Sequence, residues 1–230
     1  MSTFVKPAPA YGAPAQVVQQ RTGLLCPRPR RFKRVFDVVF ALLLGLLALP
    51  LGLLIASAIA IDSPGPVFFV HTRIGRGKRR FRLWKFRSMV TDAGPVLERY
   101  LDEHPGLALE WRSTHKLRND PRITRVGRIL RKTSLDELPQ LWNVLRGDMS
   151  MVGPRPIVQA EVPKYGPSFA LYSQVLPGLT GLWQVSGRND VTYRERVELD
   201  SKYIRNWTAA TDFSVLLKTV RVVLGGRGAY

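Results

Sequence analysis

A continuous apolar run dominates the pattern of hydrophobic and polar positions along this chain of 230 residues. Residues 35–61 read VFDVVFALLLGLLALPLGLLIASAIAI, in which Asp37 and Ser57 are the polar positions. As a helix, this run would be roughly 40 Å long, enough to cross a hydrocarbon core of about 30 Å. The pattern therefore predicts a membrane helix over residues 35–61.

Three interpretations of this run compete. Ala56-Ser57-Ala58 resembles the cleavage site of a signal peptide, but the 34 residues before the run are too many for that class. A straight spanning helix is the second. The third is a re-entrant helix that enters and leaves one leaflet, because Pro50 removes a backbone hydrogen bond in mid-run. The arms on either side of it would reach only roughly 22 Å and 17 Å, too short to cross alone.

Basic residues lie on both sides of the run. Residues 15–34 carry six Lys or Arg, and residues 62–81 carry five. Because basic flanks mark the cytoplasmic side of a membrane, this balance favours two cytoplasmic ends. We therefore expect a re-entrant helix at the cytoplasmic face of the membrane, with the spanning helix as the alternative.

The rest of the chain alternates short apolar and polar stretches. Strands are expected at 67–70 and 82–86, and helices at 95–103, 135–145 and 195–207. Residues 211–224 form an amphipathic pattern, which either packs on a core or lies in the membrane interface. Its apolar positions are Phe213, Leu216, Leu217, Val220 and Leu224. We expect a basic, Pro-rich disordered arm over 1–34 and a catalytic domain over 62–230.

Charge narrows the classes of partner. The chain has 35 Lys and Arg against 17 Asp and Glu, a formal charge of +18. Such an excess indicates anionic partners, namely nucleic acid, a negatively charged membrane surface or phosphorylated substrates. Residues 63–91 contain eight Lys or Arg and no acid. One cysteine, Cys26, excludes an internal disulfide framework and fits a reducing compartment.

The stretch RKTSLDELPQLWNVLRGDMSMVGPRP, residues 131–156, contains the strongest chemical signal. Asp136 and Glu137 are adjacent carboxylates at the expected start of a helix, because Pro139 is best tolerated in a first turn. Helix capping is the simple explanation, either by Asp136 as N-cap or by a capping box of Ser134 and Glu137.

The cations around this carboxylate pair favour phosphate chemistry instead. Arg131 and Lys132 precede the pair, and Arg155 follows it in a Gly-Pro-Arg-Pro turn. Guanidinium groups and helix N-termini bind phosphate oxygens, and a carboxylate can attack phosphorus. A second carboxylate can help to hold Mg²⁺. The spacing alone indicates phosphate chemistry, with Asp136 as the candidate nucleophile.

Several long motifs occur in an order that points further: KRVFDVV (33–39), the Pro-broken apolar run, LWKFRSM (83–89), LRKTSLDELPQLWNVLRGDMSMVGPRP (130–156) and PGLTGLWQVSGRND (177–190). Together they resemble the bacterial polyprenyl-phosphate sugar-phosphate transferases, the monotopic phosphoglycosyl transferases, over roughly residues 31–230. The resemblance implies an α/β, mostly helical body with short strands, a re-entrant membrane helix and interfacial amphipathic helices.

The resemblance also implies a ping-pong reaction with Mg²⁺ at Asp136 and Glu137. Asp136 would attack the β-phosphate of a UDP-sugar and release UMP, and undecaprenyl phosphate would then take the sugar phosphate. By position in the motifs, the phosphate- or substrate-binding candidates are Lys85, Arg87, Arg155 and Arg188, and Arg131 joins them on charge alone. For each arginine the alternative is a solvated basic face that contacts anionic membrane lipids.

Some details depart from the family pattern, and others narrow the choice of sugar substrate. The break is Leu49-Pro50 where the family often has Ser-Pro, and the N-terminal four-helix domain of long members is not expected. Residues 101–117 and the ending VVLGGRGAY resemble exopolysaccharide-initiating enzymes that use galactose or glucose. Oligomeric state stays open, a homodimer included.

Two readings without catalysis compete with this one. A nucleic-acid binder would explain aromatic residues interleaved with basic ones at 81–86, but not the apolar run, so we expect no nucleic-acid partner. A structural membrane scaffold would have no need for Asp136.

Overall fold

The apolar run forms one long helix, α1 (Pro27–Asp62), in the computed structural model, which describes residues 23–114, 117, 119–187 and 191–225. A short 3-10 turn, η1 (Gly23–Leu25), precedes it, and Pro27 suits the first helical turn because its missing N–H needs no partner there. The expected disordered arm over 1–34 therefore ends earlier than predicted. Residues 23–34 are folded, and residues 1–22 lie outside the described part of the chain.

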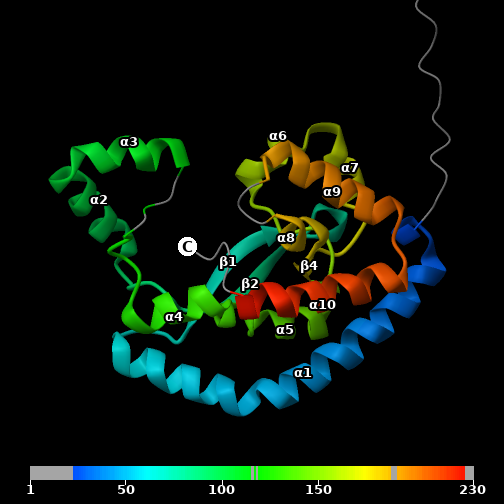
Figure 1. The fold of residues 1–230 in the computed structure, drawn as a ribbon, viewed down its shortest axis with the longest axis horizontal. Helices are drawn as coiled ribbons and strands as arrows, with labels where there is room; N and C mark the ends of the chain where they lie inside the picture. The colour runs from blue at the N-terminus through cyan, green and yellow to red at the C-terminus, as the bar shows by residue number, and fades with distance from the viewer. Residues whose placement is uncertain (1–22, 115–116, 118, 188–190, 226–230) are drawn as a thin grey trace, which may run out of the picture.

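Helix α1 continues through Pro50 and bows along one edge of the body (Figure 1). By length and composition it could cross a membrane. Its outer face is strongly apolar and open, with Leu47 79% and Ile61 86% exposed. Its inner face packs on the body through Ala41 and Ile59, which are buried. The helix is thus apolar on both faces, and one of them has no cover within the described chain.

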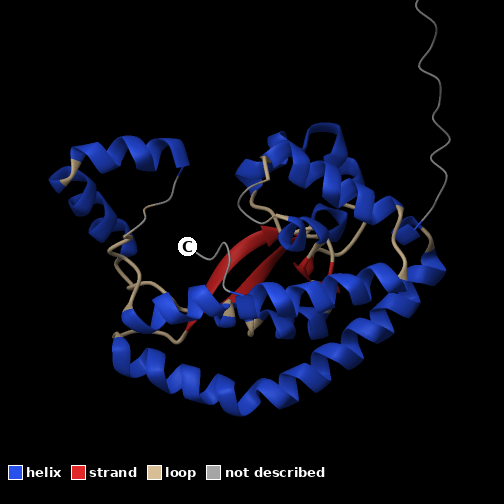
Figure 2. Ribbon diagram, in the orientation of Figure 1, coloured by secondary structure: helices blue, strands red, loops and turns tan. Residues whose placement is uncertain are grey.

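Two small sheets lie inside a mostly helical body (Figure 2). The first is an antiparallel hairpin of β1 (Phe68–Ile74) and β2 (Arg80–Phe86), in which Phe69 pairs with Lys85. Both predicted strands are confirmed and are longer than expected. The second sheet pairs β3 (Ser150–Val152) in parallel with β4 (Gly178–Thr180).

The remaining helices pack around these sheets, except for α2 and α3, which stand away from the body in Figure 1. They are α2 (Ala93–Glu103), α3 (Pro105–Thr114), α4 (Arg125–Thr133), α5 (Gln140–Arg146), α6 (Val162–Tyr165), α7 (Phe169–Tyr172), α8 (Leu182–Ser186), α9 (Tyr193–Arg205) and α10 (Ala209–Gly225). Short 3-10 turns are η2 (Arg76–Lys78), η3 (Leu135–Glu137), η4 (Gln159–Glu161) and η5 (Gly166–Ser168). The helices predicted near 95–103, 195–207 and 211–224 are confirmed as α2, α9 and α10.

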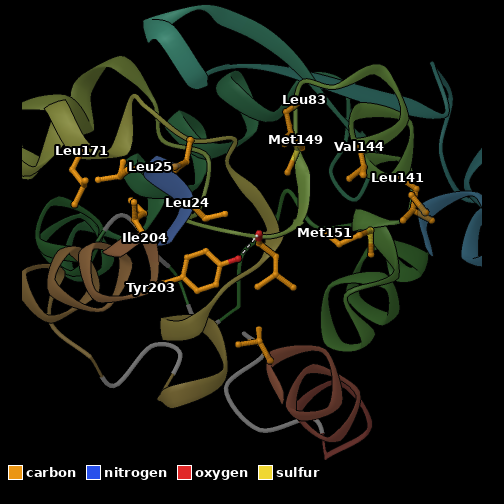
Figure 3. Packing of buried hydrophobic residues seen from close by; sticks show 14 residues of the cluster. Leu24, Leu25, Leu83, Leu141, Val144, Met149, Met151, Leu171, Tyr203 and Ile204 are labelled. Carbon is orange, nitrogen blue, oxygen red and sulfur yellow. Dashed lines mark hydrogen bonds between the residues drawn. The ribbon is translucent and has the colours of Figure 1, made fainter. Parts of the chain in front are cut away.

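The main core surrounds β3, which is buried along its whole length. Met151 and Val152 pack against side chains from α5, α9 and α10, including Val144, Tyr203 and Val215. Figure 3 shows Tyr203 pointing into this cluster, where its hydroxyl oxygen lies 2.9 Å from the carbonyl oxygen of Val152. The burial of β3 fixes the segment that leads into the Gly-Pro-Arg-Pro turn.

Both ends of α1 are joined to the same body. Near its start, Lys33 Nζ lies 2.5 Å from Asp212 Oδ2 of α10. One turn later, Asp37 Oδ1 accepts a hydrogen bond from the backbone N–H of Met151 at 3.0 Å. At its end, the Asp62 carboxylate accepts from the N–H of Val126 in α4 at 2.9 Å. Asp37 within the apolar run, and Lys33 and Asp62 on either side of it, therefore attach α1 to the folded domain.

Candidate active site

The carboxylate pair lies in η3, a single turn between α4 and α5. Ser134 adopts a left-handed conformation, with φ of 57°, which ends α4 and reverses the chain. The predicted helix over 135–145 therefore divides, and α5 begins at Gln140, directly after Pro139. The Ser134 side chain makes no capping hydrogen bond, so the capping box is not formed. Asp136 caps no helix either, and its carboxylate is engaged by a lysine from the neighbouring sheet.

Lys85 joins the two carboxylates. It projects from β2, and its Nζ lies 2.6 Å from Glu137 Oε1 and 3.4 Å from Asp136 Oδ2. The Asp136 side chain is only 12% exposed, whereas that of Glu137 is 31% exposed. The shorter contact to Glu137 leaves Asp136 the less tightly paired of the two acids.

The surroundings move the pKa values of the two acids in opposite directions. Burial raises the pKa of Asp136 above its usual value, and the neighbouring Glu137 charge adds to this rise despite the opposing effect of Lys85. For Glu137, burial also acts upward, but the Lys85 ion pair and hydrogen bond, with Arg155 and Arg73, hold the pKa below its usual value. Glu137 is therefore the more firmly ionised carboxylate, and Asp136 the more basic one.

The pair opens onto a cavity of about 970 Å³. Such a volume lies near the upper end of pockets that bind small molecules, about 300–1,000 Å³. One wall is polar and includes Lys85, Arg131, Arg155 and Arg196 with the two acids. The other is apolar and is formed by side chains of α1 and α10. Anionic and apolar parts of a ligand can thus be bound side by side.

Two of the predicted arginines line this cavity. Arg131 at the end of α4 donates from Nε to the Ser88 hydroxyl at 2.9 Å, which fixes its guanidinium beside Asp136. Arg155 follows β3, and its guanidinium carbon lies 5.8 Å from the ring centre of Trp183. Both arginines therefore present cationic groups to a ligand at Asp136.

Of the other two predicted arginines, Arg87 is not brought to the site. Arg87 is buried and donates to the carbonyls of Ser63 and Pro64, each at 2.6 Å. It holds the turn that follows α1 and does not line the cavity, and both of its terminal nitrogens, Nη1 and Nη2, donate to these backbone oxygens. Arg188 lies outside the described residues.

Sequence reasoning missed a second polar group, on α8 and α9. The Arg196 guanidinium lies 4.6 Å from the ring centre of Trp183, and both line the cavity. Among the described residues, no hydrogen-bond partner is present for the buried atoms Gln184 Oε1, Tyr193 Oη and Arg196 Nε. The motif at 177–190 contains Trp183 and Gln184 and could have indicated them. Arg196 gave no signal because it is one basic residue of many on an amphipathic helix.

The donor set suits a hard divalent cation held partly by a substrate. Within the described residues, no group of three or more His, Cys, Asp or Glu is arranged to hold a metal. Asp136 and Glu137 supply two adjacent carboxylates, and Mg²⁺ usually takes one or two of these together with water and phosphate oxygens. The residues therefore fit Mg²⁺ that arrives with a phosphorylated substrate better than a closed metal site.

Comparison with known proteins places these features in a family. The sequence pattern described as bacterial sugar transferase matches residues 28–226. The chain is 50% identical over 201 residues to a UDP-galactose-lipid carrier transferase of Erwinia amylovora, covering 87% of this chain and 42% of that protein. It is 50% identical over 207 residues to an undecaprenyl-phosphate galactose phosphotransferase of Salmonella typhimurium, covering 90% and 43%.

A third relative matches along almost its full length. The exopolysaccharide production protein ExoY of Rhizobium meliloti is 46% identical over 213 residues, covering 93% of this chain and 94% of that protein. The chain thus spans less than half the length of the first two relatives and nearly all of the third.

Proposed function

The chain belongs to the bacterial sugar transferase family, and we propose that it transfers a hexose 1-phosphate from a UDP-sugar to undecaprenyl phosphate. The products would be undecaprenyl-diphosphate-hexose and UMP, the first membrane step in the synthesis of exopolysaccharide, capsule or O-antigen. The observation that supports this most is the cavity in which a buried carboxylate, four cations and an apolar wall meet. The hexose is galactose or glucose, and the names of two relatives favour galactose.

The first half-reaction is attack by Asp136 on the β-phosphorus of the UDP-hexose. A carboxylate oxygen forms the new P–O bond while the bond from this phosphorus to the bridging oxygen of UMP breaks, and UMP leaves with the electron pair. A buried, weakly paired carboxylate is a better nucleophile than a solvated one, because no tight hydration shell has to be removed. Arg131 and Arg155 would stabilise the phosphate charge.

The second half-reaction uses the same phosphorus. A phosphate oxygen of undecaprenyl phosphate attacks it, and the bond to Asp136 breaks to restore the carboxylate. The incoming group is already an anion, so no general base is needed. Lys85 is placed to stabilise the Asp136 carboxylate as it leaves, since its Nζ is 3.4 Å from Asp136 Oδ2 in the free enzyme.

Mg²⁺ is part of the proposal. Asp136 and Glu137 would hold it together with diphosphate oxygens, and it would supply charge neutralisation for the departing UMP. Glu137, the more firmly ionised of the two, is the better resident ligand. Lys85 pairs with both acids in this structure, so Mg²⁺ would share these carboxylates with it.

The attachments of α1 support a re-entrant arrangement at the cytoplasmic face of the inner membrane. Lys33 and Asp62, near opposite ends of α1, both bond to the same body. A helix that spans the bilayer would place these two ends on opposite sides, and one of the attachments would have to break. We therefore propose that α1 dips into one leaflet as a bowed helix, held there by its exposed apolar face and by anionic lipids.

Cysteine labelling tests this topology. A cysteine at Ser2 and another at Pro66, which is exposed just beyond α1, in a Cys26→Ser background, should both react with a membrane-impermeant reagent from the cytoplasmic side only. Labelling of the two positions from opposite sides would establish a spanning helix and remove the re-entrant proposal.

The covalent intermediate tests the chemistry. Intact mass spectrometry after incubation with Mg²⁺ and UDP-galactose or UDP-glucose, without a lipid acceptor, should show an added hexose phosphate. Asp136→Asn should abolish the adduct and UMP release while membrane association persists, and Asp102→Asn, on exposed α2, should change neither. Full transfer activity in Asp136→Asn would exclude Asp136 as the nucleophile.

A further inference from the structure

The apolar part of the cavity is a groove between two helices that diverge from one point. Helices α1 and α10 are joined by the buried Lys33–Asp212 ion pair near the start of each, and they run in the same direction from it (Figure 1). Beyond this pair both helices contribute side chains to the cavity wall. The groove therefore begins next to the ion pair and extends along both helices, from Phe36 to Leu44 on α1 and from Phe213 to Val223 on α10.

The groove is lined by one stripe from each helix. Phe36, Phe40 and Leu44 recur every four residues on α1, so they lie on one face. On α10 the facing positions include Leu216, Leu217 and Val220. Leu217 and Val220 are each 57% exposed, so this side of the groove is not covered by the described chain. An apolar ligand could enter it sideways from surrounding lipid.

The polar end of the same cavity identifies the occupant. The groove is continuous with the site at Asp136, Lys85 and Arg155, because all of them line one cavity. A nucleotide sugar has no apolar chain to fill the groove, whereas a lipid phosphate has an anionic head and an apolar tail in this arrangement. Burial of the tail is favourable in proportion to the apolar area removed from water.

We propose that the groove between α1 and α10 binds the isoprenoid chain of the lipid acceptor, with its first units nearest the phosphate. This rests on the proposed function for the identity of the acceptor. The chain enters from the bilayer between the two helices, and the phosphate is guided to the aspartyl-phosphosugar by Lys85 and Arg155.

Val220→Trp tests this on the open side, where the larger side chain fills the groove without disturbing the core. Leu47→Trp is the matched control, because Leu47 is an exposed apolar position of α1 outside the groove. The two half-reactions are measured separately, as adduct formation from UDP-hexose and as discharge of the preformed adduct by undecaprenyl phosphate. Val220→Trp should raise the KM for undecaprenyl phosphate about tenfold, the effect of losing about two buried methylene groups, and leave adduct formation unchanged.

A short isoprenyl phosphate supplies the second arm of the experiment. Its discharge of the adduct should be affected less by Val220→Trp, because it occupies less of the groove, and Leu47→Trp should alter neither acceptor. An unchanged KM for undecaprenyl phosphate in Val220→Trp, or an equal loss with both acceptors, would overturn the proposal.

Photo-crosslinking tests the groove separately from the assignment of Asp136 as the nucleophile. A diazirine-bearing polyprenyl phosphate should label peptides of both α1 and α10 in the Asp136→Asn variant, where no adduct forms. Labelling confined to other segments would refute the groove as the chain site, whereas labelling of both helices without any adduct in the unmodified enzyme would refute only the nucleophile.

Discussion

Lys33 occupies a buried position between two carboxylates, and Lys33→Met should destabilise the fold more than Asp212→Asn. Lys33 Nζ lies 2.5 Å from Asp212 Oδ2 and 3.6 Å from Asp37 Oδ1. The three side chains are 7%, 4% and 2% exposed, in that order. Removal of the lysine leaves both acids facing each other without this cation, whereas removal of the Asp212 charge leaves Lys33 paired with Asp37.

The magnitudes follow from these contacts. Breaking a buried ion pair by removal of one partner costs about 3–5 kcal/mol, because the other charge stays buried. In Asp212→Asn the amide oxygen can still accept the hydrogen bond that Tyr203 donates to Asp212 Oδ1 at 2.6 Å. The cost is then nearer about 1–3 kcal/mol. For a chain of this size about 1 kcal/mol shifts the Tm by about 2–4 °C, so we expect losses of about 12 °C for Lys33→Met and about 6 °C for Asp212→Asn.

Thermal unfolding followed by circular dichroism in lipid nanodiscs of fixed composition measures both losses. Hydrogen exchange should show α10 losing protection first, since the ion pair ties it to α1. The control is Lys218→Met, an exposed lysine on α10, which should change stability by no more than about 0.5 kcal/mol. Equal losses in the two test variants, or a Tm unchanged by Lys33→Met, would refute the reasoning.

Three further predictions concern the site and its supports. As the proposed nucleophile, Asp136 would attack only as its carboxylate. Because its pKa is raised, adduct formation should fall on the acid side at a pH above the usual aspartate pKa. Lys85→Met removes an influence that lowers that pKa and should move this limb of the pH–rate profile to higher pH. Arg87→Met should lower the Tm by several degrees but leave the KM for UDP-hexose unchanged. The reason is that the hydrogen bonds of the Arg87 guanidinium in the structure go to the carbonyls of Ser63 and Pro64. A raised KM without loss of Tm would contradict this placement. Gly178→Ala should prevent the β3–β4 pairing, because an added Cβ would lie 2.1 Å from the backbone nitrogen of Gly153. The expected loss of folded protein is measured as the soluble yield. A near-normal yield and Tm would show that the two strands can separate at little cost.

Periodicity and length predicted the elements that depend on local pattern. The apolar run, the hairpin strands and the helix over 211–224 were all found close to their expected ranges, because each has a period or composition that tertiary contacts do not override. The motif around Asp136 located the carboxylate pair, and the fold brings Lys85 to it across 51 residues of sequence. Register explains this meeting, since Lys85 lies within a strand whose pairing with β1 fixes the direction of its side chain.

Features that depend on long-range contacts could not be predicted in the same way. Lys33 read as part of a disordered basic arm, yet it is buried against Asp212, which lies 179 residues further along the chain. Arg87 read as a phosphate ligand because it follows a basic strand, and only the position of the 63–64 turn shows that backbone oxygens engage it. The break expected at Pro50 is a bend that the helix absorbs, because a proline removes one hydrogen bond and the rest of α1 remains intact.

The cavity has a single set of phosphate-binding groups, and this affects the order in which the two substrates can use it. Lys85, Arg131 and Arg155 surround Asp136, so the phosphate of the donor and that of the lipid would compete for the same cations. If both substrates bound together, three phosphorus centres and at least three negative charges would share this space. Release of UMP before the lipid phosphate engages would remove the conflict, and the proposed covalent link to Asp136 would keep the hexose phosphate in place meanwhile. The proposed lipid chain would lie along α1 and α10, whose cavity-lining residues are mostly apolar. For the proposed transfer we therefore expect UMP to leave before the lipid phosphate takes its place, which is the order that a ping-pong reaction requires.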